Sequence, residues 1–131
     1  MPRSPARGPT ERELSILRVL WKQGSSTVRE VHRTLQSELG VAYNTVLTML
    51  QVMTDKGLVT RDETRYPQHY VASQAQEVTQ EAMTKDFIDQ VFGGSALQLV
   101  QRALLAKPAS EEELEHLEAF LRTQRGESHD V

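Results

Sequence analysis

The sequence predicts a mainly α-helical protein in which three helices and a β-hairpin precede a second helical region. Three observations predict this fold: apolar residues recur at the helical period, capping residues mark the expected helix starts, and β-branched and aromatic residues flank one polar turn. We expect a flexible basic arm at 1–9, a first domain at 10–73, a helical domain at 74–126 and a flexible tail at 127–131.

The first two helices begin at capping boxes, in which two side chains accept hydrogen bonds from free backbone N–H groups at a helix start. Thr10 with Glu13 forms the first box, and Thr27 with Glu30 forms the second. The apolar residues that follow predict one helix to about residue 21 and another over about 28–39. The second helix is expected to bury Val28, Val31, Leu35 and Leu39.

The third helix and the hairpin complete the first domain. We expect this helix to begin near Asn44, the one good N-cap residue in its segment, and to end before Gly57. The following sequence LVTRDETRYPQHYVA places β-branched and aromatic residues on both sides of a polar turn, which predicts strands at about 58–62 and 68–72. The small core of this domain is expected to form around Leu17, Val31, Leu35, Val46, Leu50 and Leu58.

Three further helices are expected from residue 74 onward, opened by the pairs Ser73 with Gln76, Ser95 with Gln98, and Ser110 with Glu113. Helices of this size have too little depth to form a filled core alone, so we expect their apolar stripes to meet a second copy of the chain. The alternative is a monomer in which the stripes fold back on the N-terminal helices. The expected dimer contacts are Val78, Met83, Phe87, Ile88, Val91, Phe92, Leu97, Val100, Leu104, Leu114, Leu117 and Leu121.

Composition excludes several classes of protein. The chain has no cysteine, which excludes disulfides, thiolate metal sites and a cysteine nucleophile. No apolar run approaches the roughly 18 residues of a membrane span, and no apolar segment follows the N-terminal arginines as in a secretory signal, so we expect a cytoplasmic protein without membrane insertion. The net charge of −3 divides into a mildly basic half up to residue 73 and an acidic half after it, which suggests two modules with different partners.

Catalytic constellations are hard to find in this sequence. The four histidines fall on separate expected elements, and only His116 shares a helix face with a carboxylate, that of Glu113. Two such residues on an acidic helix are common by chance and make a poor metal site. No Gly-rich phosphate loop or nucleophile elbow occurs. We therefore expect no enzyme activity, no cofactor and no metal.

The third helix is unusual because its polar face carries small and amide side chains. In the order helix, helix, helix, hairpin, it takes the place of the recognition helix of a winged helix-turn-helix, whose N-terminal half enters the major groove of DNA. There an amide can pair with adenine, and a threonine methyl can pack on the thymine methyl. The alternative is an ordinary polar face on a core helix. The expected base contacts are Asn44, Thr45, Thr48 and Gln51.

Arginines near this helix are expected to contact the DNA backbone. Arg61 and Arg65 lie in or beside the expected wing, and Arg12 lies beside the N-terminal arm. Arg3 and Arg7, within the arm, are further candidates. Phosphate contacts of this kind position a protein on DNA and carry no sequence information by themselves.

The segments TERELSILRVLW, STVREVHRTL, AYNTVLTMLQVMTDKGLVTRD and FIDQVFGGS resemble the penicillinase and methicillin-resistance repressor family, BlaI/MecI, in order and spacing from Thr10 to about Gln124. The resemblance implies a winged-helix head that binds a palindromic operator, a helical C-terminal part that forms the homodimer, and release by a membrane-bound sensor protease that cleaves the repressor. It also places Thr45 and Thr48 where family members carry base-contacting threonines.

The chain departs from the family pattern at two places. Val52 stands where many relatives carry an arginine that contacts DNA, and Arg102-Ala103 stands where the Asn-Phe bond of cleaved members lies. The sequence thus favours a homodimeric transcriptional repressor with double-stranded operator DNA as its partner. Two alternatives stay open, a winged helix that docks on a protein and a repressor that senses a small molecule.

Overall fold

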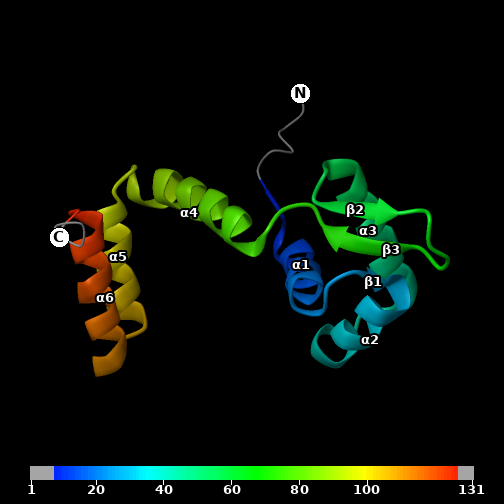
Figure 1. The fold of residues 1–131 in the computed structure, drawn as a ribbon, viewed down its shortest axis with the longest axis horizontal. Helices are drawn as coiled ribbons and strands as arrows, with labels where there is room; N and C mark the ends of the chain where they lie inside the picture. Colours follow the sequence, from blue (N-terminus) through cyan, green and yellow to red (C-terminus); the bar gives the residue numbers. More distant parts are fainter. Residues whose placement is uncertain (1–7, 127–131) are drawn as a thin grey trace. The chain divides into compact units, whose positions relative to one another are not determined.

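The computed structural model describes residues 8–126 and confirms the mainly α-helical fold with its hairpin (Figure 1). Two compact units divide after Lys85, twelve residues beyond the boundary expected at residue 73, and each is described by itself. The elements in chain order are α1 (Glu11–Gln23), β1 (Ser26–Thr27), α2 (Val28–Leu39), α3 (Tyr43–Lys56), β2 (Val59–Asp62), β3 (His69–Ala72), α4 (Gln76–Phe92), α5 (Ala96–Ala106) and α6 (Glu111–Gln124).

Capping side chains determine most of the helix starts. Thr10, Thr27 and Ser110 each form a complete capping box, and the Ser95 hydroxyl accepts a hydrogen bond from the N–H of Gln98. The box predicted at Ser73 is wrong, because α4 begins at Gln76 and the Ser73 hydroxyl lies 3.2 Å from that of Thr60 on β2. A side chain engaged across the sheet is not available to cap a helix.

The N-cap predicted at Asn44 is also wrong. The N-cap of helix α3 is Ala42, two residues earlier, and no side chain caps the helix. The approach to this helix is fixed by tertiary contacts instead: Val41 is buried, and its carbonyl oxygen lies 3.0 Å from Nε2 of His32. Because Val41 is held in the core, helical geometry begins at Tyr43, before Asn44.

The sheet has three antiparallel strands in the order β1-β3-β2. The hairpin of β2 and β3 was predicted, but β1, which pairs Ser26 with Tyr70, was not. A two-residue strand is too short to show any alternation of apolar and polar residues. This strand joins the connection between α1 and α2 to the wing.

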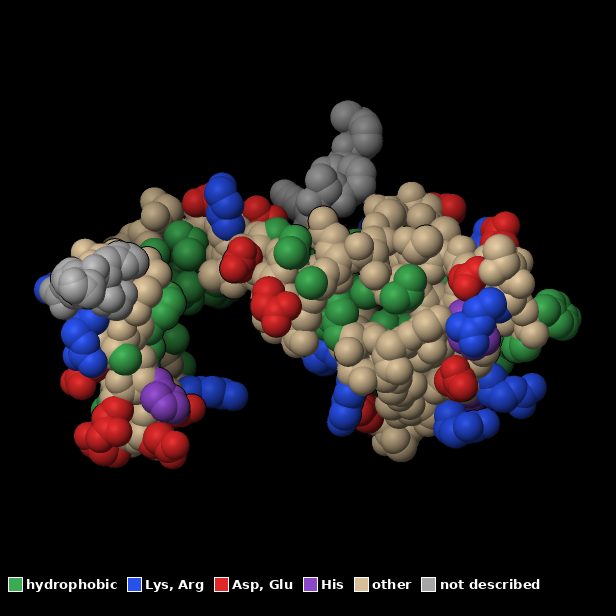
Figure 2. All heavy atoms as spheres, viewed as in Figure 1, with side chains coloured by type: hydrophobic (Ala, Val, Ile, Leu, Met, Phe, Trp, Pro, Cys, Tyr) green, Lys and Arg blue, Asp and Glu red, His purple; other side chains and the backbone are tan. Residues whose placement is uncertain are grey.

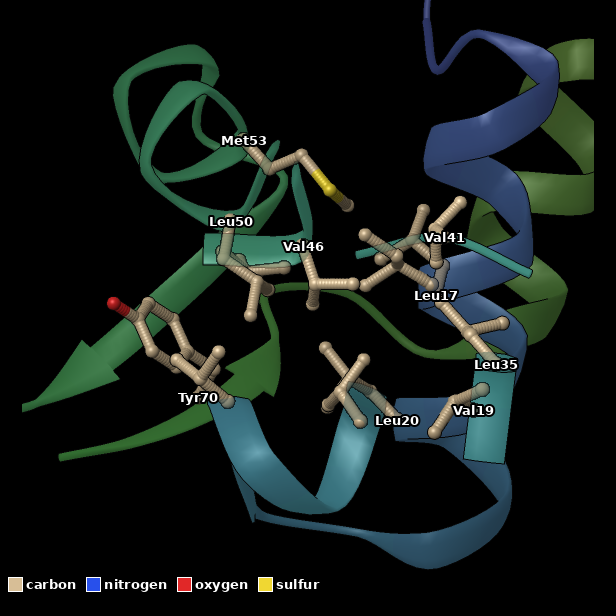
Figure 3. Close-up of a cluster of buried hydrophobic side chains, with 13 residues drawn as sticks. Leu17, Val19, Leu20, Leu35, Val41, Val46, Leu50, Met53 and Tyr70 are labelled. Carbon is tan, nitrogen blue, oxygen red and sulfur yellow. The ribbon is translucent and has the colours of Figure 1, made fainter. Parts of the chain in front are cut away.

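The core of the first unit is formed by one face of each of the helices α1, α2 and α3 and by the inner face of the sheet (Figure 3). Leu58 is only partly buried and Leu39 is 42% exposed, so the burial expected for Leu39 is wrong: it lies in the last helical position, next to the chain reversal at Gly40. The buried apolar residues are Ile16, Leu17, Val19, Leu20, Val28, Val31, Leu35, Val41, Val46, Leu50, Met53, Val59 and Tyr70.

The second unit has a different character, because α5 and α6 contain no buried residue. The two helices lie side by side (Figure 1) and line an apolar groove of about 760 Å³ between Leu104 and Ala103 on one helix and Leu117 and Phe120 on the other. Hydrophobic side chains are visible at the surface of this unit in Figure 2. Within residues 8–126, no helix has the length and apolar character required to cross a bilayer.

A partly buried ion pair joins the first turn of α1 to the last turn of α3. Nζ of Lys56, in the last turn of α3, lies 2.8 and 3.0 Å from the carboxylate oxygens of Glu13 in α1. One of those oxygens also accepts the Thr10 N–H at 2.9 Å. Burial would raise the pKa of Glu13, but the hydrogen bonds from Lys56 and Thr10 outweigh it and hold the pKa below its ordinary value.

This pair makes stability depend on pH. A carboxyl group with a depressed pKa stabilises the fold fully above its unfolded pKa of about 4.3, and that contribution is lost as the pH falls through the folded-state pKa. We expect Lys56→Met to lower the free energy of unfolding by about 1–3 kcal/mol at neutral pH, because a buried charge loses its partner.

The measurement is urea unfolding of the wild type and Lys56→Met at several pH values between about 7 and 3.5, across the range in which carboxyl groups titrate. The stability difference should shrink towards the acid end. Lys22→Met, at an exposed lysine in the last turn of α1, serves as the matched control and should change stability little at any pH. A Lys56→Met difference that is the same at all pH values would contradict the role of the ion pair.

Candidate nucleic-acid interface

Helix α3 has two faces of different character. Val46, Leu50 and Met53 are buried in the core. The residues predicted to contact bases, Asn44, Thr45, Thr48 and Gln51, are all exposed, and Val52 and Asp55 are exposed with them. At 100° per residue, Asn44, Gln51 and Asp55 form one stripe and Thr45 and Val52 the next, with Thr48 between them.

The single cation of α3 borders this face, one turn beyond Val52, and is held in an ion pair. The helix sequence YNTVLTMLQVMTDK contains no arginine and one lysine, Lys56, whose ammonium group is bound to Glu13. The side chain of Lys56 is 25% exposed and that of Glu13 only 8%. The exposed face of α3 therefore displays amides, hydroxyls and methyl groups, with Asp55 as its one formal charge.

The first turn of α1 borders this face. A groove of about 530 Å³ lies between the two helices. It is lined by the N-cap Thr10 with Glu11, Arg12 and Glu13 of α1, and by Thr45, Thr48, Met49 and Val52 of α3. The fold thus brings Arg12 beside Thr45 and Thr48, across more than thirty residues of sequence. The neighbouring carboxylate of Glu13 is neutralised by Lys56, so it adds little repulsion towards an anion.

The two arginines of the wing differ in their surroundings. Arg61 is held by Glu63, at 3.0 Å from Nε and 2.9 Å from its terminal nitrogen. Hydrogen bonding to Tyr70 makes the largest contribution to raising the pKa of Arg61 above its ordinary value, and hydrogen bonding to Glu63 makes the next largest. Arg65 lies exposed in the turn between β2 and β3. Of the two, Arg65 is the one whose side chain is presented by the tip of the wing.

The turn of the wing is shaped by local hydrogen bonds. Oδ1 of Asp62 accepts from both the hydroxyl and the backbone N–H of Thr64, at 2.6 and 3.0 Å. These bonds hold the pKa of Asp62 below its ordinary value. An aspartate that caps its own turn is a common device in hairpin loops. Here it fixes the backbone from which Arg65 projects.

Tyr43 was not among the residues predicted for this surface. Its side chain is 41% exposed at the start of α3, and its ring makes an edge contact with His32 of α2, with centroids 5.8 Å apart. An exposed aromatic residue directly before Asn44 was the available signal. Arg3 and Arg7 of the expected arm lie outside the described residues.

Two solved structures share this fold. A MarR family protein from Bacillus stearothermophilus matches with a TM-score of 0.50 and 20% identity, over 93% of this chain and 76% of that protein. The complex structure of hsRosR-S4 matches with a TM-score of 0.52 and 21% identity, over 95% of this chain and 96% of the other. Identities this low support the fold alone.

Sequence comparison identifies the family. No curated protein sequence matches the chain. The family model described as the penicillinase repressor matches residues 9–123, which is nearly the whole chain and includes both helical units. The residues that resembled this family in the sequence therefore do belong to its pattern, and the chain is a member of the penicillinase repressor family.

Proposed function

We propose that the protein is a homodimeric transcriptional repressor that binds a palindromic operator through the exposed face of α3. The observation that carries this proposal is the composition of that face: it presents Asn44, Thr48 and Gln51 to solvent, next to Thr45, with no flexible cation among them. Amide and hydroxyl groups of this kind suit the edges of base pairs. Arg12 beside the groove and Arg65 on the wing are placed to contact the DNA backbone.

The second unit supports the proposal of a homodimer. Its helices expose apolar side chains that a stable globular unit would bury, among them Leu97 at 65% and Leu121 at 58% exposure. Exposed apolar side chains that gather on one surface mark protein–protein interaction sites. A second copy of the same helices would cover these side chains and fill the groove between α5 and α6. DNA binding by two joined heads would then be bivalent.

Proteolysis in the C-terminal region is the release step that we propose. Arg102 and Ala103, which stand at the position of the bond cleaved in some relatives, lie exposed within α5. A protease binds extended backbone, so cleavage here requires local opening of α5. In a dissociated monomer, where α5 has no buried residue, this opening costs little. A membrane-bound sensor protease remains part of this proposal as the partner that performs the cut.

Substitution of Thr48 tests the base-reading role of α3. We expect Thr48→Ala to weaken operator binding by about five- to tenfold, because a hydroxyl and a methyl group are lost at a base edge. Binding to random duplex DNA should change less than about twofold. The matched control is Thr123→Ala, on exposed α6 surface. Equal losses on both DNAs, measured by fluorescence anisotropy, would assign Thr48 a structural role.

Substitution of Arg65 tests the contact to the DNA backbone. We expect Arg65→Ala to weaken binding to operator and to random DNA by the same factor. The negative slope of log affinity against log salt concentration should become shallower by about 0.9, because one phosphate contact is lost. The control is Arg122→Ala, which removes an exposed arginine from α6. A change in sequence preference in Arg65→Ala would show that this arginine contacts bases.

Removal of the second unit tests the homodimer. A fragment ending at Lys85 retains the hydrogen bond from Nε1 of Trp21 to the Gln74 carbonyl and the buried Thr79, so we expect it to fold. It should sediment as a monomer and bind operator at least about tenfold more weakly than the full chain, which should sediment as a dimer. Affinities within about threefold of each other, or a monomeric full chain at micromolar concentration, would contradict the proposal.

A further inference from the structure

The exposed face of α3 carries a stripe of methyl groups that extends beyond the two threonines. Thr45, Thr48 and Val52 are separated by three and four residues, so they fall within about 60° of one another around the helix axis. All three line the groove beside α1. The side chain of Val52 is 44% exposed. An isolated exposed valine would be ordinary, but this one continues the same stripe by a full turn.

The charges around the stripe of methyl groups restrict which bases it can recognise. Arginine and lysine recognise guanine through bidentate contacts to O6 and N7. Helix α3 offers no such group, because its only cation, Lys56, is bound to Glu13. The exposed methyl groups of Thr45, Thr48 and Val52 have one apolar counterpart in the major groove, the C5-methyl group of thymine.

We propose that Val52 is a further specificity-determining residue and that, with the methyl groups of Thr45 and Thr48, it packs on thymine C5-methyl groups of a half-site rich in A·T pairs. The proposal rests on the proposed function, in which α3 enters the major groove. The neighbouring amides of Asn44 and Gln51 complement it, since they suit the adenine partners of those thymines. Arg12, on the other side of the groove, supplies the attraction to phosphate that the stripe lacks.

The test removes the methyl groups from the DNA. The full chain first selects its preferred duplexes from a randomised pool, which defines the half-site. Each thymine of that half-site is then replaced by uracil, which lacks only the C5-methyl group and keeps the base pairing. We expect the wild type to lose about fourfold in affinity at each thymine that α3 contacts, as for one buried methyl group. A half-site without thymine under α3, or no loss at any thymine, would overturn the proposal.

The variant Val52→Ala assigns one of these thymines. It should bind the unsubstituted duplex about as weakly as the wild type binds the duplex with uracil at that position. Replacing that thymine by uracil should then cause no further loss of affinity in Val52→Ala. Thr48→Ser, which removes a methyl group and keeps the hydroxyl, should do the same at a different thymine. The matched control is Val71→Ala, at a valine 41% exposed on β3, which should retain every uracil effect of the wild type.

The outcomes separate this proposal from the proposed function. If Val52→Ala and the wild type lose affinity equally at every uracil, the effect belongs to DNA shape and Val52 does not read thymine, although the repressor still binds its site. If selection returns no enriched sequence, the chain is not a sequence-specific binder and both proposals fail. Circular dichroism of the variants confirms that the folds are unchanged, and the uracil scan of the wild type decides the methyl readout without any variant.

Discussion

The burial of one face of α3 is the constraint on which the rest of the head depends. Val46, Leu50 and Met53 pack against α1, α2 and the sheet, and each is fully enclosed. Burial of such side chains contributes roughly 1.5–3 kcal/mol each, so the helix cannot rotate about its axis without losing much of the stability of a small domain. Burial thus fixes the orientation of α3 about its own axis. This orientation determines which residues of α3 face solvent.

Charge is distributed so that the exposed face of α3 carries no unpaired cation. Lys56 forms an ion pair with Glu13 of α1, and Arg61 forms an ion pair with Glu63 on the wing. The arginines proposed to contact phosphate are Arg12, in the first turn of α1 beside α3, and Arg65, in the turn of the wing. In the proposed complex with DNA, base recognition and backbone contact would therefore belong to different elements of the fold.

Local signals in the sequence were sufficient to predict most elements but not their contacts. Capping boxes at Thr10, Thr27 and Ser110 predicted three helix starts because both partners lie within one turn. The start of α3 could not be predicted in this way, since it depends on the burial of Val41. The exposed residues of α3 followed from periodicity, whereas the groove with Arg12 and the pair of Lys56 with Glu13, 43 residues apart, required the folded structure.

The absence of an unpaired cation from the exposed surface of α3 has a consequence for competition within a genome. Bulk chromosomal DNA sequesters a regulator in proportion to its salt-dependent attraction to any phosphate backbone, and millions of such sites compete with each operator. A helix that offers methyl and amide groups gains little from random sequence, because these groups are satisfied only by the matching base edges. If α3 reads bases as proposed, fewer molecules would be retained on unrelated DNA, and a small pool of protein per cell would suffice to keep the proposed operator occupied.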